Sequence, residues 1–218
     1  MLKAVLFDLD GTLIDSTDAI MASFWHLFDT IGEARPDREA LLCGIGHPLH
    51  EELPLLTNRD PNECAPIYRA YYDEHASANT VLLPHARETL AALRDAGVAV
   101  GFATSKSRPS AEMLVRDLGV LDYFAVRIGP EDVCRPKPHP ECVLQALEAF
   151  AAAPGEMVFV GDMHFDVEAA RAAGVRCVCV TTGYERRDEL EALGPEAVFD
   201  GLDEALRHLL GSVGAGSG

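Results

Sequence analysis

The chain has little positive charge. Of its 218 residues, 18 are Lys or Arg and 35 are Asp or Glu, which gives a formal net charge of −17. A surface this acidic argues against nucleic acid or an anionic membrane as the main partner. Lysine is especially scarce, with only Lys3, Lys106 and Lys137 in the whole sequence. An anionic substrate would therefore need a metal ion or a few well-placed basic residues.

Paired cysteines and long apolar runs are also missing. The six cysteines form no Cys-x-x-Cys pair, so neither a zinc framework nor a disulfide scaffold is expected. Cys177 and Cys179 alternate along a Val-rich run and are predicted to be buried as small hydrophobes. No stretch approaches the roughly 18 apolar residues of a membrane span. Because Asp8 and Asp10 interrupt the only early apolar run, no signal peptide is expected, and a reduced, cytoplasmic setting is predicted.

Short apolar runs alternate with helical segments along most of the chain. The predicted strands cover residues 4–7, 98–103, 126–128, 157–160, 175–180 and 197–199. The predicted helices cover residues 85–96, 109–118, 140–152, 165–173 and 203–210. The strand runs are continuous rather than alternating, which is typical of strands covered on both faces. The pattern therefore predicts an α/β fold with a doubly wound parallel sheet.

One segment interrupts this rhythm. Residues 16–83 contain no convincing strand, and an apolar stripe in 18–31 predicts a helix there, with shorter helices around 38–42, 48–56 and 62–75. We predict an all-helical cap domain over 16–83, inserted into an α/β core domain of 1–15 and 84–211. The small residues of 212–218 predict a disordered tail. Since ligands of open α/β sheets bind beyond the carboxyl ends of the strands, the cap would cover that site.

Polar side chains follow the predicted strands in several places. Asp8-Leu9-Asp10-Gly11-Thr12 comes directly after the first strand, and two carboxylates so close repel unless a cation lies between them or one keeps its proton. Three further clusters are expected at the same sheet edge, namely Thr104-Ser105-Lys106, Arg135-Pro136-Lys137-Pro138, and Gly161-Asp162 with Asp166. Carboxylate oxygens suit Mg²⁺, whereas lysine and hydroxyl groups suit phosphoryl oxygens. Together they predict a phosphoryl-transfer site.

With these motifs the chain resembles the haloacid dehalogenase-like (HAD) superfamily from Lys3 to about Leu210. More narrowly, it resembles phosphatases of the phosphoglycolate phosphatase type, which carry a helical cap after the first motif. The resemblance implies a HAD-like, Rossmannoid core. It also implies Mg²⁺-dependent hydrolysis of a small phosphomonoester through an aspartyl-phosphate intermediate. A small phosphorylated metabolite would be the partner, and the protein would be a monomer or a homodimer.

The resemblance also implies a role for each carboxylate. Asp8 would be the nucleophile that attacks phosphorus. Asp10 would protonate the leaving oxygen and then act as the base that activates water. The Asp8 carboxylate, the Asp10 backbone carbonyl and Asp162 would bind Mg²⁺. Asp166 would orient Lys137 or a metal-bound water, and it also suits the N-terminal turn of a helix.

The remaining implied site residues would contact the substrate. Thr104 would donate a hydrogen bond to the phosphoryl group, and Lys137 would contribute positive charge to it. Ser105, Lys106 and the cap glycine Gly46 would bind the substrate. Lys106 could instead be a solvated residue at the start of a helix, and the loop around Gly46 an ordinary turn.

Other activities within the superfamily fit less well. Asp10 favours phosphate chemistry over dehalogenation, and the absence of lysine between Lys3 and Lys106 excludes a Schiff base formed by the cap. Ile20 stands where the related phosphomutases carry histidine. A phosphomutase, a sugar-phosphate phosphatase and a catalytically silent binding protein remain as alternatives. Met163 departs from the small hydroxyl residue common in relatives. A substrate carboxylate could be bound by a cap arginine, the candidates being Arg35, Arg38, Arg59 and Arg69.

Overall fold

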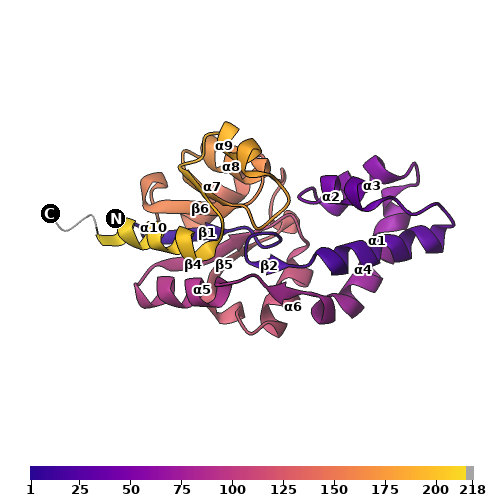
Figure 1. The fold of residues 1–218 in the computed structure, drawn as a ribbon, viewed down its shortest axis with the longest axis horizontal. Coiled ribbons are helices and arrows are strands. Elements are labelled where there is room, and N and C mark those ends of the chain that lie inside the picture. The colour runs from indigo at the N-terminus through magenta and orange to yellow at the C-terminus, as the bar shows by residue number, and fades with distance from the viewer. Residues whose placement is uncertain (215–218) are drawn as a thin grey trace.

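A six-stranded parallel sheet forms the centre of the computed structural model, which describes residues 1–214 (Figure 1). The strand order is β5-β4-β1-β6-β7-β8. The bounds are β1 Ala4–Phe7, β4 Ala99–Ala103, β5 Phe124–Ile128, β6 Met157–Gly161, β7 Arg176–Val180 and β8 Ala197–Phe199. The first strand lies in the middle and pairs with β4 and β6. The predicted α/β fold class is confirmed.

Helices cover both faces of this sheet (Figure 1). Val5 and Phe7 pack in one core with α5 (Ala86–Asp95), α6 (Arg108–Asp117) and α10 (Leu202–Gly214). Ala4 and Leu6 pack on the other face with α7 (Glu141–Ala149) and α8 (His164–Ala172). Both faces of β1 are therefore buried, which explains its unbroken apolar run. Cys177 and Cys179 are buried in the second core, as predicted.

Four helices gather at one end of the sheet, on the right of Figure 1. They are α1 (Thr17–Ile31), α2 (Arg38–Gly44), α3 (Leu49–Leu56) and α4 (Pro61–His75). The longer two pack together, with the rings of Phe24 and Tyr68 4.6 Å apart. We call residues 17–79 the cap helices. The predicted domain boundaries at residues 16 and 83 stay a prediction.

A small antiparallel sheet lies where the chain enters and leaves the cap helices. Its strands are β2 (Ile14–Asp15) and β3 (Val81–Leu82). The sequence does not predict them, because two residues are too few for any hydrophobic period. Two adjacent crossings of the chain thus connect the cap helices to the core.

The last helix is longer than its sequence pattern indicates. It continues to Gly214, so the predicted disordered tail is wrong for residues 212–214, and residues 215–218 lie outside the described part of the chain. The short helix α9 (Arg187–Ala192) was not predicted either, because six residues show little periodicity. Short 3₁₀ helices cover Ala76–Asn79, Leu121–Tyr123, Pro130–Asp132 and Pro154–Glu156.

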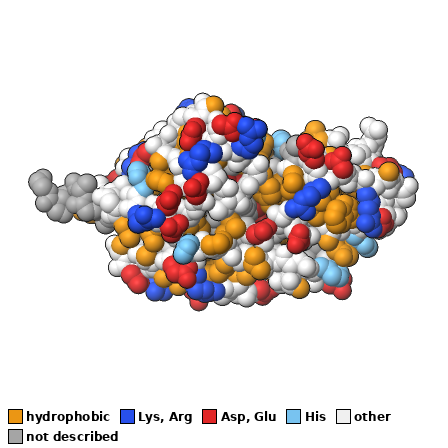
Figure 2. Space-filling view, in the orientation of Figure 1, with side chains coloured by type: hydrophobic (Ala, Val, Ile, Leu, Met, Phe, Trp, Pro, Cys, Tyr) orange, Lys and Arg blue, Asp and Glu red, His pale blue; other side chains and the backbone are white. Residues whose placement is uncertain are grey.

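The described surface is mixed in charge. On the face drawn in Figure 2, basic side chains are scattered among acidic ones on both lobes. Within residues 1–214, no helix combines the length and the apolar character needed to cross a membrane.

Close packing at Gly101 in β4 leads to a stability prediction. A Cβ there would lie 2.8 Å from the carbonyl oxygen of Val126 and 2.8 Å from the ring of Phe150. Overpacking of this kind costs about 1–3 kcal/mol, so Gly101→Ala should lower the free energy of unfolding by that amount. Gly155→Ala is the matched control, because a Cβ at Gly155 has no neighbour within 4 Å. Denaturant unfolding of both variants checks this, and equal stabilities would contradict it.

Candidate active site

A tight turn after β1 directs the first motif to the carboxyl edge of the sheet. The backbone N–H of Asp8 still donates to Val160 on β6, at 2.9 Å. The N–H groups of Leu13 and Ile14 then donate to the Leu9 carbonyl, at 2.8 and 2.9 Å. Gly11 has φ = +81°, and a Cβ there would overlap the carboxylate of Asp162. The glycine of the motif is therefore required both by its backbone angle and by this close approach.

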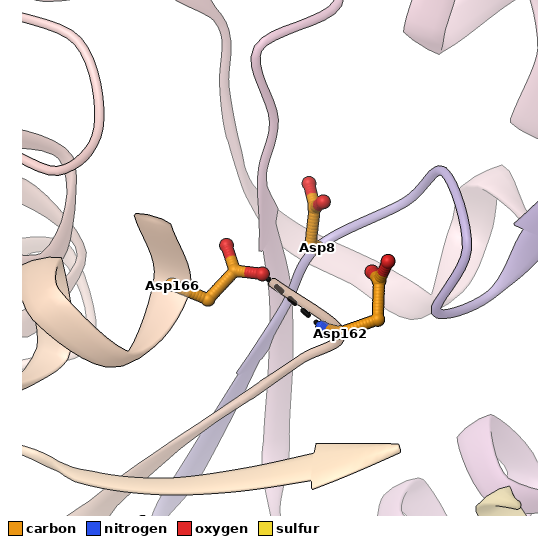
Figure 3. A group of neighbouring side chains, drawn as sticks. All are labelled: Asp8, Asp162 and Asp166. Carbon is orange, nitrogen blue, oxygen red and sulfur yellow. Dashed lines mark hydrogen bonds between the residues drawn. The ribbon is translucent and has the colours of Figure 1, made fainter. Parts of the chain in front are cut away.

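Three buried carboxylates meet at this edge (Figure 3). Asp8 follows β1, Asp162 follows β6 and Asp166 lies in the first turn of α8, with ligand atoms all within 4.8 Å of one another. Asp162 and Asp166 are completely buried, and Asp8 is 7% exposed. Burial raises the pKa of Asp8 to about 7; the charge of Lys137 lowers it, and the nearby Asp166 and Asp10 raise it further. Burial, with Asp8 and Asp166, also raises the pKa of Asp162.

One ammonium group holds this cluster together. Lys137 Nζ donates to Asp166 Oδ1 at 2.7 Å and lies 3.1 Å from Asp8 Oδ1 in an ion pair. Burial disfavours its charge, yet Asp166 and Asp8 keep the pKa of Lys137 above its usual value. The other oxygen of Asp166, Oδ2, accepts from the backbone N–H groups of Asp162 and Met163, at 3.2 Å each. Both oxygens of Asp166 are thus already in use.

The second aspartate of the motif has a separate environment. Asp10 accepts a hydrogen bond from Ser16 Oγ and forms an ion pair with Lys106 at 3.2 Å. The same ammonium donates to the hydroxyl of Tyr72 in α4, at 2.7 Å. Lys106 is therefore not a solvated surface residue, because its side chain is only 9% exposed and connects the core to a cap helix.

A cavity of about 240 Å³ lies between the core and the cap helices. Its predicted lining residues are Asp8, Asp10, Thr104, Ser105, Lys106 and Gly46. Ser105 Oγ is buried and has no hydrogen-bond partner among the residues that the structure describes, so it can bind a ligand. Gly46 has φ = +105°, and a Cβ there would lie 2.7 Å from Met163 Sδ, which fits a close approach of the cap loop.

The other predicted residues lie behind the cavity wall or away from it. Lys137, Asp162 and Asp166 surround Asp8 without lining the cavity. Of the four cap arginines, Arg69 lines this cavity, and Arg38 lines a second, separate one. The remaining two are paired elsewhere, Arg35 with Asp29 at 2.8 Å and Arg59 with Glu33 at 3.0 Å.

Several residues of the site have no clear sequence signal. Thr12 belongs to the first motif, but the sequence gives it no role; in the structure its Oγ1 donates to Asp162 Oδ1 at 2.7 Å. Ser16, Tyr72 and Glu52 lie outside any motif. Gly183 follows β7, and a Cβ there would overlap the Asp162 carboxylate. Only the fold brings these four residues to the site.

Known proteins share this architecture. The family model for haloacid dehalogenase-like hydrolases matches residues 5–180. The phosphoglycolate phosphatase of Salmonella typhimurium strain LT2 is 32% identical over 232 aligned positions, which cover 94% of this chain and 91% of the relative. The phosphoglycolate phosphatase of Escherichia coli O157:H7 is 31% identical with the same coverage. A haloacid dehalogenase-like family hydrolase from Streptococcus pneumoniae has a TM-score of 0.86 at 27% identity, covering 95% of this chain and 98% of that one.

These similarities extend over the motifs and the cap helices alike, because nearly the whole chain is covered. They confirm the predicted resemblance and the prediction of a hydrolase that acts on phosphomonoesters. The acidic cluster is consistent with a divalent metal, which phosphatases of this family generally use. The chain belongs to the haloacid dehalogenase-like hydrolase family.

Proposed function

We propose that the protein hydrolyses a small phosphomonoester with the help of Mg²⁺, through an aspartyl-phosphate on Asp8, and that 2-phosphoglycolate is the first candidate substrate. The observation that carries this is the position of Asp8, which lines the cavity on one side and contacts Lys137 on the other. The substrate is suggested by the relatives called phosphoglycolate phosphatase, which align over 94% of the chain.

The donor set fits Mg²⁺. We assign the Asp8 and Asp162 carboxylates and the Asp10 backbone carbonyl as its ligands, because hard oxygen donors are what this ion prefers. Asp166 is assigned to orient Lys137, since both of its oxygens already accept hydrogen bonds. When bound, the ion would offset the repulsion between the carboxylate nucleophile and the anionic phosphate.

The proposed reaction proceeds in two displacements. In the first, an Asp8 oxygen forms a bond to phosphorus, the bond to the leaving oxygen breaks, and Asp10 donates a proton to that oxygen. In the second, Asp10 takes a proton from water, which attacks phosphorus, releases inorganic phosphate and regenerates Asp8. Thr104 and Ser105, which line the cavity, would hold the phosphoryl oxygens, and Lys137 would contribute positive charge from behind Asp8. Asp10 suits proton transfer because Ser16 and Lys106 hold its carboxylate apart from the three-aspartate cluster.

The residues that line the cavity also help to choose between a hydrolase, a phosphomutase and a sugar-phosphate phosphatase. Ile20 lines it as an apolar side chain and offers no group for proton transfer, which favours a hydrolase over a phosphomutase. Arg69 is a cap cation on its wall and suits the carboxylate of phosphoglycolate. A sugar-phosphate substrate stays an alternative. The cytoplasmic location, the absence of a nucleic-acid partner and the monomeric or dimeric state stay predictions.

Removal of the nucleophile should abolish turnover. With Mg²⁺ and p-nitrophenyl phosphate, we expect Asp8→Asn to reduce activity below detection and Asp10→Asn to lower kcat about 10²- to 10⁴-fold. The matched control is Asp122→Asn, an exposed aspartate on the core, which should keep full activity. Circular dichroism should show that all three variants are folded. Normal turnover by Asp8→Asn would refute the assigned nucleophile.

Metal binding can be measured without turnover. Mg²⁺ at about 100 times its Kd should raise Tm by about 5–10 °C, because it neutralises a buried cluster of like charges. Asp162→Asn should remove this Mg²⁺-dependent increment, whereas Asp122→Asn should keep it. If Mg²⁺ raised the Tm of Asp162→Asn as much as that of the wild-type protein, the ion would bind at a different site.

A panel of phosphorylated metabolites tests the substrate directly. Short phosphorylated carboxylates, 2-phosphoglycolate first, should show a higher kcat/KM than hexose phosphates, since Arg69 on the cavity wall can pair with a carboxylate. A higher kcat/KM for hexose phosphates would favour the sugar-phosphate alternative, and no turnover of any ester would refute the proposed activity.

A further inference from the structure

A buried carboxyl group in the cap helices has no role in the chemistry described above. Glu52 lies in α3, is 5% exposed and lines the cavity. Its Oε1 is buried without a hydrogen-bond partner. Within the described residues, its side chain forms neither a hydrogen bond nor an ion pair. A buried polar group without a partner costs free energy, which makes a binding role the physical explanation to test.

The packing around Glu52 leaves it facing few compensating charges. Gly44 at the end of α2 covers it, and a Cβ at Gly44 would lie 2.5 Å from Oε1. Lys106 is the cation that acts on it, but that ammonium is already paired with Asp10 and Tyr72. The other titratable groups on the wall of the same cavity are His47, His50, Tyr68, Arg69, Asp8 and Glu131.

Glu52 should therefore be neutral at pH 7. An isolated carboxylate is strongly disfavoured in a buried site, and such a group takes up a proton instead. Consistently, burial raises the pKa of Glu52 to about 8, which Lys106 offsets only in part. A neutral carboxyl group has an O–H that can donate a hydrogen bond into the cavity.

We propose that Glu52 is a specificity-determining residue, which donates a hydrogen bond from its neutral carboxyl group to the carboxylate of the leaving group. The proposal rests on the proposed function and deepens it, because it names the substrate class as short phosphorylated carboxylates. Arg69, on the wall of the same cavity, supplies the complementary positive charge.

Other leaving groups match this arrangement less well. An ammonium group would need an ionised Glu52, which burial opposes, and it would also meet the charge of Arg69. A hydroxyl group could accept from Glu52, but it gains nothing from Arg69 comparable to an ion pair. Hydrogen bonds to a charged partner are about twice as strong as those between neutral groups, so the carboxylate gains most.

The test uses three esters of similar size that differ at one end. They are 2-phosphoglycolate, 2-hydroxyethyl phosphate and phosphoethanolamine, which end in a carboxylate, a hydroxyl and an ammonium group. At pH 7 the wild-type protein should show the highest kcat/KM for 2-phosphoglycolate. Glu52→Ala should lower the preference for 2-phosphoglycolate over 2-hydroxyethyl phosphate about 10- to 100-fold, the value of one hydrogen bond to a charged group.

Two matched variants test whether the preference depends on a hydrogen-bond donor at position 52 or on the carboxylate charge of this segment. Glu52→Gln keeps an N–H donor and nearly the same shape, so it should largely keep the preference. Glu51→Gln changes the adjacent, exposed carboxylate and should leave the preference unaltered. A wild-type preference for phosphoethanolamine, or an unchanged preference in Glu52→Ala, would overturn the role of Glu52. No turnover by the wild-type protein of these three esters or of any ester in the metabolite panel would instead refute the proposed function.

The pH dependence gives a second readout. As pH rises through about 8, Glu52 ionises and repels the substrate carboxylate, so the preference for 2-phosphoglycolate over 2-hydroxyethyl phosphate should fall. The ratio of the two kcat/KM values is unaffected by the titration of groups that change the turnover of both substrates equally. The ratio should stay flat in Glu52→Gln. A wild-type ratio equally flat up to about pH 9.5 would overturn the proposal.

The protonation state can be checked without any substrate. In the unfolded chain the Glu52 carboxyl ionises near its ordinary pKa of 4.5, whereas in the folded protein it ionises near about 8. Between these values the unfolded state binds fewer protons, so the wild-type protein loses stability relative to Glu52→Gln as pH rises. The difference in Tm should grow from about pH 4.5 to about pH 8 and then level off. A constant difference would show that Glu52 is ionised when folded and would overturn the neutral donor.

Discussion

The ion pairs of Lys137 are the interaction on which the site depends. One buried ammonium faces Asp166 and Asp8, while Asp162 adds a third buried carboxylate nearby. Removing one partner of such a buried group typically costs about 3–5 kcal/mol, because the remaining charge is left uncompensated. The cluster nevertheless keeps more carboxylates than cations. This imbalance is consistent with a divalent ion at this edge of the sheet.

The parallel sheet and the cap helices contribute different residues to the cavity. The parallel sheet brings Asp8, Thr104 and Asp162 to one edge, because strands that run in the same direction end on the same side. The cap helices close the cavity over these groups and contribute Gly46, Glu52 and Arg69. In the proposed function, phosphoryl chemistry and substrate choice therefore depend on different segments of the chain. Lys106 connects the two, since its ammonium contacts both Asp10 and Tyr72.

Most of the core could be predicted because its signals are local and strong. Strand β1 is an apolar run buried on both faces, and β8 also ends where the pattern places it. The missed elements β2, β3 and α9 are too short to show a period. They are held by contacts between segments far apart in the sequence, as when Ile14 pairs with Leu82. Helix α10 continues past the predicted end at residue 210, because the small residues that follow extend the helix instead of ending it.

The sequence by itself determined the chemistry of the site. Asp8 and Asp10, two residues apart after a buried strand, already require a cation or two different protonation roles. Only the tertiary structure decided how these charges are shared, because pKa values depend on burial and on partners from other segments. It also singled out Arg69 among the cap arginines and, within the described part of the chain, left Glu52 without a hydrogen-bond partner in the same cavity. No local pattern contains that information, since each of these contacts joins segments that only the packing of cap helices on the core brings together.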